Sequence, residues 1–212
     1  MKKILITLAA ALVLASCLDV NPILYRCMIM GYVKPDGTVK GDDGRIYTFS
    51  SLEADWRAGD RVLLLMDVSE QVNDSVYKAS SVTYSYPLYK KPVVVENAPV
   101  PDSLGTDPIQ LINAWYAGGC LNVSAGIQLV PENGTHAINL LIDRTGDPSD
   151  TVSLALRHRS DYEPQSSDIL SDYSFYASFP LRSYLPEKDS VILKISWVWD
   201  DKPYSTAAKV ER

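Results

Sequence analysis

The run Ala58-Gly59-Asp60-Arg61-Val62-Leu63-Leu64-Leu65-Met66-Asp67-Val68 decides the fold class of this 212-residue chain. Turn-forming Gly59 and Asp60 come before Val62–Val68, which is apolar except at Asp67. A short apolar run after turn residues predicts a strand that is buried on both faces, as in a small closed barrel. We therefore predict an all-β protein.

Strand-like segments lie on both sides of this run. Residues 25–33 and 45–49 precede it and residues 77–86 follow it, with Pro-Asp-Gly and Gly-Asp-Asp-Gly turns between the first two. Short strands joined by such turns are typical of a small Greek-key barrel, of which the OB fold is one example. The sequence predicts that residues 22–96 form this barrel.

The second half of the chain predicts a separate domain. Residues 97–108 contain three prolines and no alternation, which indicates a linker. In residues 109–212, about seven strand-like segments with polar turns, including the Asn133-Gly134 hairpin signal, predict an immunoglobulin-like β-sandwich. These segments are residues 109–115, 121–129, 137–143, 152–159, 175–181, 191–199 and 204–210.

The first residues are typical of a secretory signal. Lys2 and Lys3 precede the apolar residues 4–14, which are too few for the roughly 20 residues of a spanning helix. Leu14-Ala15-Ser16-Cys17 also resembles a bacterial lipobox. This resemblance implies that the signal peptide, residues 1–16, is removed and that Cys17 carries a diacylglyceryl group and an N-acyl chain. The alternative is an ordinary cleaved signal after which Cys17 bears no lipid.

A lipidated Cys17 makes residues 17–21 a short tether to the membrane, because two or more acyl chains anchor a protein stably. Leu18 after the cysteine favours the outer membrane by resemblance to lipoprotein sorting, and both its periplasmic and its surface face stay open. The cleaved chain keeps 18 basic and 26 acidic side chains, a net charge of −8. An envelope location argues against a nucleic-acid partner, as does the predicted barrel, whose nine basic and ten acidic side chains in residues 22–96 offer no positive groove.

The order of the parts resembles the NigD-like lipoproteins, in which a lipobox, a small barrel, a linker and a β-sandwich follow one another. The resemblance implies no enzymatic activity and no catalytic residue, and it points to bacteriocin immunity or protection of the envelope. The stretches that carry the resemblance are residues 41–47, 59–62, 107–109, 114–116, 136–140 and 152–158.

The sequence gives little support for catalysis. It has no Gly-x-Ser-x-Gly elbow and no His-x-x-x-His or Cys-x-x-Cys spacing, so we predict no catalytic residue, no metal site and no cofactor. A hydrolase remains a weaker alternative, with Asp161 and Glu163 or Asp200 and Asp201 as acid–base pairs. Both pairs lie beside prolines at strand ends, which also fits solvated turns.

The two histidines and the two remaining cysteines have structural interpretations. His158 shares a strand face with Val152 and Leu154, which places it at the rim of the core, while spacing alone cannot bring it to His136. Cys27 and Cys120 either form a disulfide in the oxidising envelope or remain isolated strand residues.

Aromatic residues suggest an accessory carbohydrate-binding lipoprotein as the main alternative function. Trp197 and Trp199 share a face with apolar residues and are assigned to the core. The ligand-binding residues stay unknown, and the partner is an envelope protein or a glycan. The better exposed aromatic candidates are Tyr84, Tyr86, Tyr89, Tyr173, Phe175, Tyr176 and Tyr184.

Four tripeptides resemble the Asp-(Ser/Thr)-aliphatic acceptor of a bacterial periplasmic O-glycosylation system. Their hydroxyl residues are Ser75, Ser103, Thr151 and Ser190, and Ser103 in the linker is expected to be the most accessible. Together the sequence features predict a lipid-anchored cell-envelope binding protein without catalysis.

Overall fold

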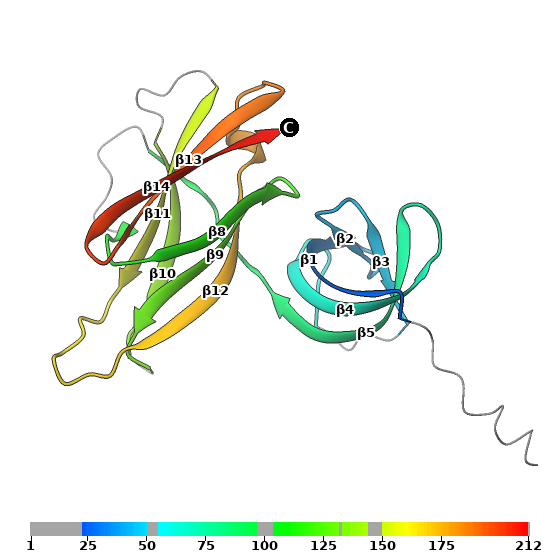
Figure 1. Cartoon of the computed structure of the whole chain (residues 1–212), viewed down its shortest axis with the longest axis horizontal. Helices are drawn as coiled ribbons and strands as arrows, with labels where there is room; N and C mark the ends of the chain where they lie inside the picture. The colour runs from blue at the N-terminus through cyan, green and yellow to red at the C-terminus, as the bar shows by residue number, and fades with distance from the viewer. Residues whose placement is uncertain (1–22, 51–54, 97–103, 132, 144–149, 212) are drawn as a thin grey trace, which may run out of the picture. The chain divides into compact units, whose positions relative to one another are not determined.

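The computed structural model describes residues 23–50, 55–96, 104–131, 133–143 and 150–211, and it confirms the all-β class (Figure 1). The chain divides into one compact unit that ends at Pro87 and a second that runs from Leu88 to Arg212. The predicted signal peptide and tether lie outside the described residues. Within the described part, no helix is both long and apolar enough to span a membrane.

The first unit is a closed five-stranded barrel. Its strands are β1 (Tyr25–Val33), β2 (Val39–Gly41), β3 (Ile46–Phe49), β4 (Arg61–Gln71) and β5 (Val76–Pro87). They close in the order β1-β2-β3-β5-β4, with β3 and β5 parallel and the other neighbours antiparallel. The run Val62–Val68 is buried except at half-buried Leu65, so the predicted two-sided burial and OB-like barrel are confirmed.

A buried ion pair links separate segments of the barrel. The Arg61 guanidinium has no exposed surface and donates two hydrogen bonds to the Asp42 carboxylate, one of 2.7 Å from Nη1 to Oδ1. The same guanidinium lies 4.7 Å from the centre of the Tyr32 ring. These contacts connect the start of β4 with β1 and with the turn after β2.

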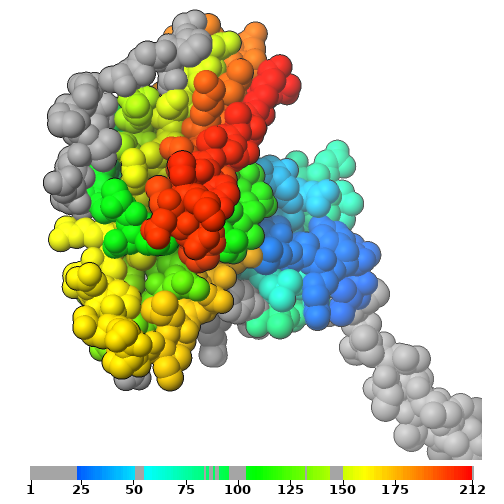
Figure 2. All heavy atoms as spheres, turned by 60° about the vertical axis from the view of Figure 1, so that its left-hand side comes forward, coloured from blue at the N-terminus to red at the C-terminus, as the bar shows by residue number. Residues whose placement is uncertain are grey.

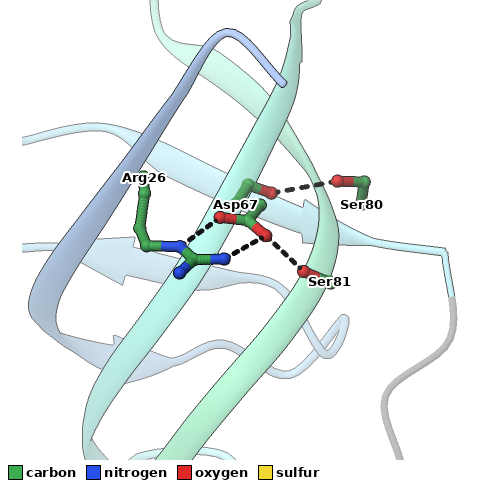
Figure 3. Close-up of polar contacts among 4 residues, drawn as sticks. All are labelled: Arg26, Asp67, Ser80 and Ser81. Carbon is green, nitrogen blue, oxygen red and sulfur yellow. Dashed lines mark hydrogen bonds and ion pairs between the residues drawn. The ribbon is translucent and has the colours of Figure 1, made fainter. Parts of the chain in front are cut away.

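Asp67 interrupts the apolar run of β4 because it holds three strands together (Figure 3). Its carboxylate accepts hydrogen bonds from Arg26 Nε at 2.6 Å, Arg26 Nη2 at 3.0 Å and Ser81 Oγ at 2.9 Å. Ser80 Oγ donates to the Asp67 backbone carbonyl at 3.4 Å. The bonds from Arg26 and Ser81 hold the pKa of Asp67 below its usual range.

The second unit is a β-sandwich of two sheets, as predicted. One sheet has the order β14-β13-β11-β10-β7 and the other β6-β12-β9-β8. Buried residues from both sheets form its core, among them Val123, Leu140, Leu156, Phe179 and Ile195. The strands are β6 (Tyr89–Lys90), β7 (Val94–Glu96), β8 (Gln110–Ala117), β9 (Cys120–Leu129), β10 (His136–Asp143), β11 (Thr151–Ser160), β12 (Ser171–Pro180), β13 (Ser190–Trp199) and β14 (Lys202–Glu211).

The structure moves the boundary between the units. Residues up to 96 were assigned to the barrel from their sequence, but β6 pairs with β12 and β7 pairs with β10 in the sandwich. The division therefore lies after Pro87. A short strand carries no local signal of the sheet that it joins, because its partners here lie 40 or more residues away in the sequence.

Strand β14 forms the edge of its sheet and lies on the surface, red in Figure 2. All its residues are exposed except Val210, which packs against the sandwich core. Asp200 and Asp201 form the turn that leads into β14, with φ of 51° and 55°. Left-handed backbone at two successive residues is typical of a tight two-residue hairpin.

We predict that Asp42→Ala lowers the free energy of unfolding of the barrel by about 3 kcal/mol, because it leaves the Arg61 charge buried. Hydrogen exchange of β1 and β4 amides measures this change. Asp200→Asn is the matched control. The side chains of Asp200 and its ion-pair partner Lys202 are 73% and 68% exposed, and such exposed pairs contribute less than about 1 kcal/mol. Equal losses in the two variants would contradict the prediction.

Candidate functional site

A cavity of about 470 Å³ lies in the sandwich unit, where the end of β9, the start of β10 and the end of β11 meet two connecting segments. Its size is in the range of small-molecule sites. Among the described residues that line it are three carboxylates and no lysine or arginine. The lining residues are Asp107, Pro108, Gln128, Leu129, Val130, Asn133, His136, His158, Ser160, Asp161, Tyr162, Glu163, Pro164 and Leu170.

The two histidines of the chain meet in this cavity. The register of β10 and β11 pairs Ile138 with His158, so His136 lies two residues along the neighbouring strand. The rings stack with their centres 5.2 Å apart and their planes at 19°, and His136 Nδ1 is 3.0 Å from His158 Nε2. His158 is 2% exposed, so it lies deeper than the predicted rim of the core.

A backbone carbonyl fixes the protons of this pair. His158 Nδ1 lies 3.0 Å from the Pro108 oxygen, which can only accept, so Nδ1 must donate. In a neutral ring Nε2 of His158 then accepts, and His136 Nδ1 must donate to it. Nε2 of His136 is left as a buried nitrogen without a hydrogen-bond partner in the described structure.

Burial lowers the pKa of His158, and the hydrogen bond to the Pro108 carbonyl opposes this effect. The nearby His136 ring also lowers this pKa, and Asp107 raises it. The cause that dominates is the loss of water around the charged form.

Residues 104–109, which we name the docked segment, form one wall of the cavity. The Asp107 backbone N–H donates to the His158 carbonyl at 3.0 Å, and the Ser160 backbone N–H donates to Asp107 Oδ2 at 2.5 Å. A Cβ on Gly105, whose φ is +77°, would lie 2.3 Å from the His158 carbonyl oxygen. Residues 104–108 were predicted as linker and instead pack on the sandwich, while residues 97–103 lie outside the described residues.

The loop after β11 forms a second part of the lining. Both carboxylate oxygens of Asp161 accept from Thr135, at 2.5 Å from the backbone N–H and 2.6 Å from the hydroxyl, and these bonds lower the Asp161 pKa. Tyr162 donates its hydroxyl to Asp168 at 2.7 Å, which raises the Tyr162 pKa. Glu163 also lines the cavity, and its carboxylate makes no hydrogen bond in the described structure.

The carboxylates considered for a hydrolase separate into two places. Asp161 and Glu163 both line the cavity, whereas Asp200 and Asp201 form the exposed turn between β13 and β14. A glycosidase needs one carboxylic acid with a raised pKa. Asp161 has the opposite shift, because Thr135 stabilises its charged form.

Among the aromatic candidates whose side chains are described, Phe175 and Tyr184 pack partly against the sandwich core. Tyr173 is 49% exposed and stacks with Phe175 on β12, with ring centres 6.4 Å apart. Trp197 packs partly against the core, as assigned, and stacks with Tyr204 on β14. The side chains of the candidates at positions 84, 86 and 89 lie outside the description. The aromatic residue that does line the cavity, Tyr162, was not among the candidates.

The remaining predicted residues are scattered. Cys17 and Ser103 lie outside the described residues. Ser75 is exposed in the β4–β5 turn, Ser190 is half-buried, and Thr151 is 8% exposed.

Two further predictions concern the remaining cysteines and metal binding. Cys27 in the barrel and Cys120 in the sandwich are free thiols. In the described part of the chain, no three His, Cys, Asp or Glu side chains cluster in a way that could hold a metal ion.

Three stretches that carry the family resemblance, residues 107–109, 136–140 and 152–158, each bring a residue to the cavity. That coincidence is a signal that could have indicated the site, although the sequence analysis left the ligand-binding residues unknown. Gln128 and Asn133 had no such signal, because isolated amides at strand ends are ordinary turn residues.

A family model described as the NigD-like C-terminal beta sandwich domain matches residues 91–207. A search of curated proteins found no match. Similar solved structures include a NigD-like immunity protein from Bacteroides caccae, with 16% identity, TM-score 0.63 and coverage of 90% of this chain and 98% of that chain. A candidate lipoprotein from Bacteroides fragilis has 9% identity, TM-score 0.63 and coverage of 88% and 98%. A candidate toxin-related protein from Parabacteroides distasonis has 18% identity, TM-score 0.68 and coverage of 88% and 94%.

We predict that the free energy of unfolding falls as the pH drops from about 7.5 to about 5.5. The lowered pKa of His158 means that the unfolded chain binds more protons in this range, so stability is full above the ordinary histidine pKa of about 6.5 and is lost below it. Urea denaturation at each pH measures the slope. His158→Asn should flatten it, and a stability that rises on acidification would contradict the assignment.

Asp161 and Asp168 do not change the free energy of unfolding between about pH 7.5 and 5.5. The lowered pKa values of Asp161 and Asp168 lie below the ordinary aspartate value of 3.8, so their contribution to stability is lost only at more acidic pH.

Proposed function

The chain belongs to the NigD-like family, and from this premise we propose that it is a lipid-anchored binding protein of the cell envelope that acts without catalysis. The observation that carries the proposal is the state of the polar groups in the sandwich cavity. Asp161 is held in its charged form by two hydrogen bonds from Thr135, which lower its pKa. A glycosidase needs a carboxylic acid with a raised pKa, so this carboxylate suits a group that binds and orients a ligand better than a proton donor.

The anchor would be Cys17, which follows a lipobox-like Leu-Ala-Ser sequence. The candidate lipoprotein from Bacteroides fragilis, which shares the fold, supports an envelope location. Within the envelope we favour the outer membrane because Leu18 follows the cysteine. Confinement to a membrane surface raises the effective concentration of a module for a partner on the same surface, so even weak binding becomes useful.

Bacteriocin immunity or protection of the envelope is the role that we favour. The structure from Bacteroides caccae is named as a NigD-like immunity protein and covers nearly the same length of chain. An immunity protein needs to bind and shield rather than to transform its partner. A cavity without lysine or arginine in its described lining suits a basic or neutral ligand.

Carbohydrate binding is the second candidate, and the lining of the cavity favours it. Sugar hydroxyls need several acceptors and donors beside an aromatic face. Glu163, Asn133 and Gln128 offer such groups, and Tyr162 offers a ring. The combination is more typical of a neutral polyhydroxylated ligand than of an anion.

For the anchor, we predict that Cys17→Ala moves the protein from the membrane fraction to the soluble fraction of cells. Removal of the thiol removes the attachment point of both acyl chains that would hold the chain on the bilayer. Fractionation and detergent phase partition measure the change. Cys27→Ser is the matched control and should stay in the membrane, and a Cys17→Ala protein that also stays there would overturn the anchor.

For the cavity, we predict that Glu163→Gln weakens binding of the preferred glycan about tenfold or more, since a hydrogen bond to a charged group contributes about 1.5–3 kcal/mol. Glu187→Gln, at an exposed position that is not part of the lining, should bind like the unchanged protein. A glycan array followed by titration calorimetry makes the comparison.

Glycan binding and bacteriocin resistance together distinguish the carbohydrate function from the immunity function. No glycan binding by the unchanged protein would exclude the carbohydrate function. Loss of bacteriocin resistance in a deletion strain would support immunity, and unchanged resistance to bacteriocins made by neighbouring strains would count against it.

A further inference from the structure

Three apolar side chains are exposed at one end of the barrel. Ile23 and Leu24, just before β1, are each 55% exposed, and Val72, just after β4, is 54% exposed. The Leu24 backbone N–H donates to the Val68 carbonyl at 2.7 Å, and β1 runs antiparallel to β4. The start of β1 therefore lies beside the end of β4, and the three side chains share this end of the barrel.

The same end receives the proposed tether. Ile23 comes six residues after Cys17, and six extended residues span at most about 20 Å. A lipid on Cys17 would therefore keep the start of β1 close to the headgroups. Exposed apolar side chains in that position can enter the boundary between headgroups and acyl chains.

We propose that this barrel end, Ile23, Leu24 and Val72, contacts the lipid surface and orients the barrel on the membrane. The proposal rests on the lipid anchor proposed above. It goes beyond that anchor because an acyl chain alone fixes the distance to the bilayer and leaves the orientation of the barrel free.

The charges around the patch indicate the kind of lipid surface. Glu70 near the end of β4 and Asp74 in the β4–β5 turn are exposed, and Lys78 pairs with Glu70 in the register of β4 and β5. Arg45, which donates to the Tyr25 hydroxyl at 3.4 Å, forms an ion pair with Asp43. The acidic side chains around this end offset the basic ones, whereas anionic headgroups attract clusters of lysine and arginine. The patch therefore suits a zwitterionic surface, where apolar contact supplies the binding.

The first test uses the lipidated full chain in phosphatidylcholine vesicles. An environment-sensitive fluorophore is attached at Val72→Cys in a Cys27→Ser background, since Cys120 is only 1% exposed and resists labelling. Lys40→Cys, exposed on β2 and paired with Tyr32 near the far end of β1, is the matched control.

We expect spin-labelled lipids to quench the fluorophore at position 72 at least about threefold more than at position 40, because only the first would lie at the interface. Equal quenching in protein that is bound to vesicles would overturn the patch and leave the anchor standing. Protein that does not bind to the vesicles at all would overturn the anchor, and the patch with it.

A second measurement removes the lipid. In a Cys17→Ala chain, Leu24→Ser with Val72→Ser should lower the residual partition into the same vesicles about threefold to tenfold, because partition scales with buried apolar area. Ile169→Ser, at a position that is 81% exposed in the sandwich, is the apolar control. An equal loss in both would overturn the assignment to the barrel end.

Discussion

The hydrogen bond from His158 Nδ1 to the Pro108 carbonyl holds the candidate site together. It places a buried ring of β11 against the docked segment, and the bonds of Asp107 to His158 and Ser160 act at the same point. Without these contacts the docked segment would lose its polar attachment to β11, and one wall of the cavity would open. The site is thus made by the connection between β7 and β8 and by strand ends of the sandwich, rather than by the sheets alone.

Much of the fold could be predicted because its signals are local. Local sequence indicates the conformation of the apolar run of β4, of the turns and of the seven segments of the second half. The run and all seven segments form strands in the structure. Pairing between distant segments has no such signal. For this reason β6 and β7 were assigned to the barrel although they complete the sheets of the sandwich, and residues 104–108 of the docked segment were assigned to a linker.

The site was less predictable because it depends on register. Alternation along β11 placed His158 near the core, but only the pairing of β10 with β11 brings it to His136. The sequence indicated Asp161 and Glu163 as a possible carboxylate pair. It could not indicate their surroundings, because the hydrogen bonds of Asp161 come from Thr135 on another loop. Chemistry that depends on partners from other elements therefore needs the structure.

The hydrogen bonds through the two imidazoles have a fixed direction. The Pro108 oxygen fixes the hydrogen on His158 Nδ1, and the bond between the rings then runs from His136 Nδ1 to His158 Nε2. A carbonyl at one end of this series therefore sets the orientation of a ring that it does not touch. The two strand ends and the docked segment are thereby joined in one polar series.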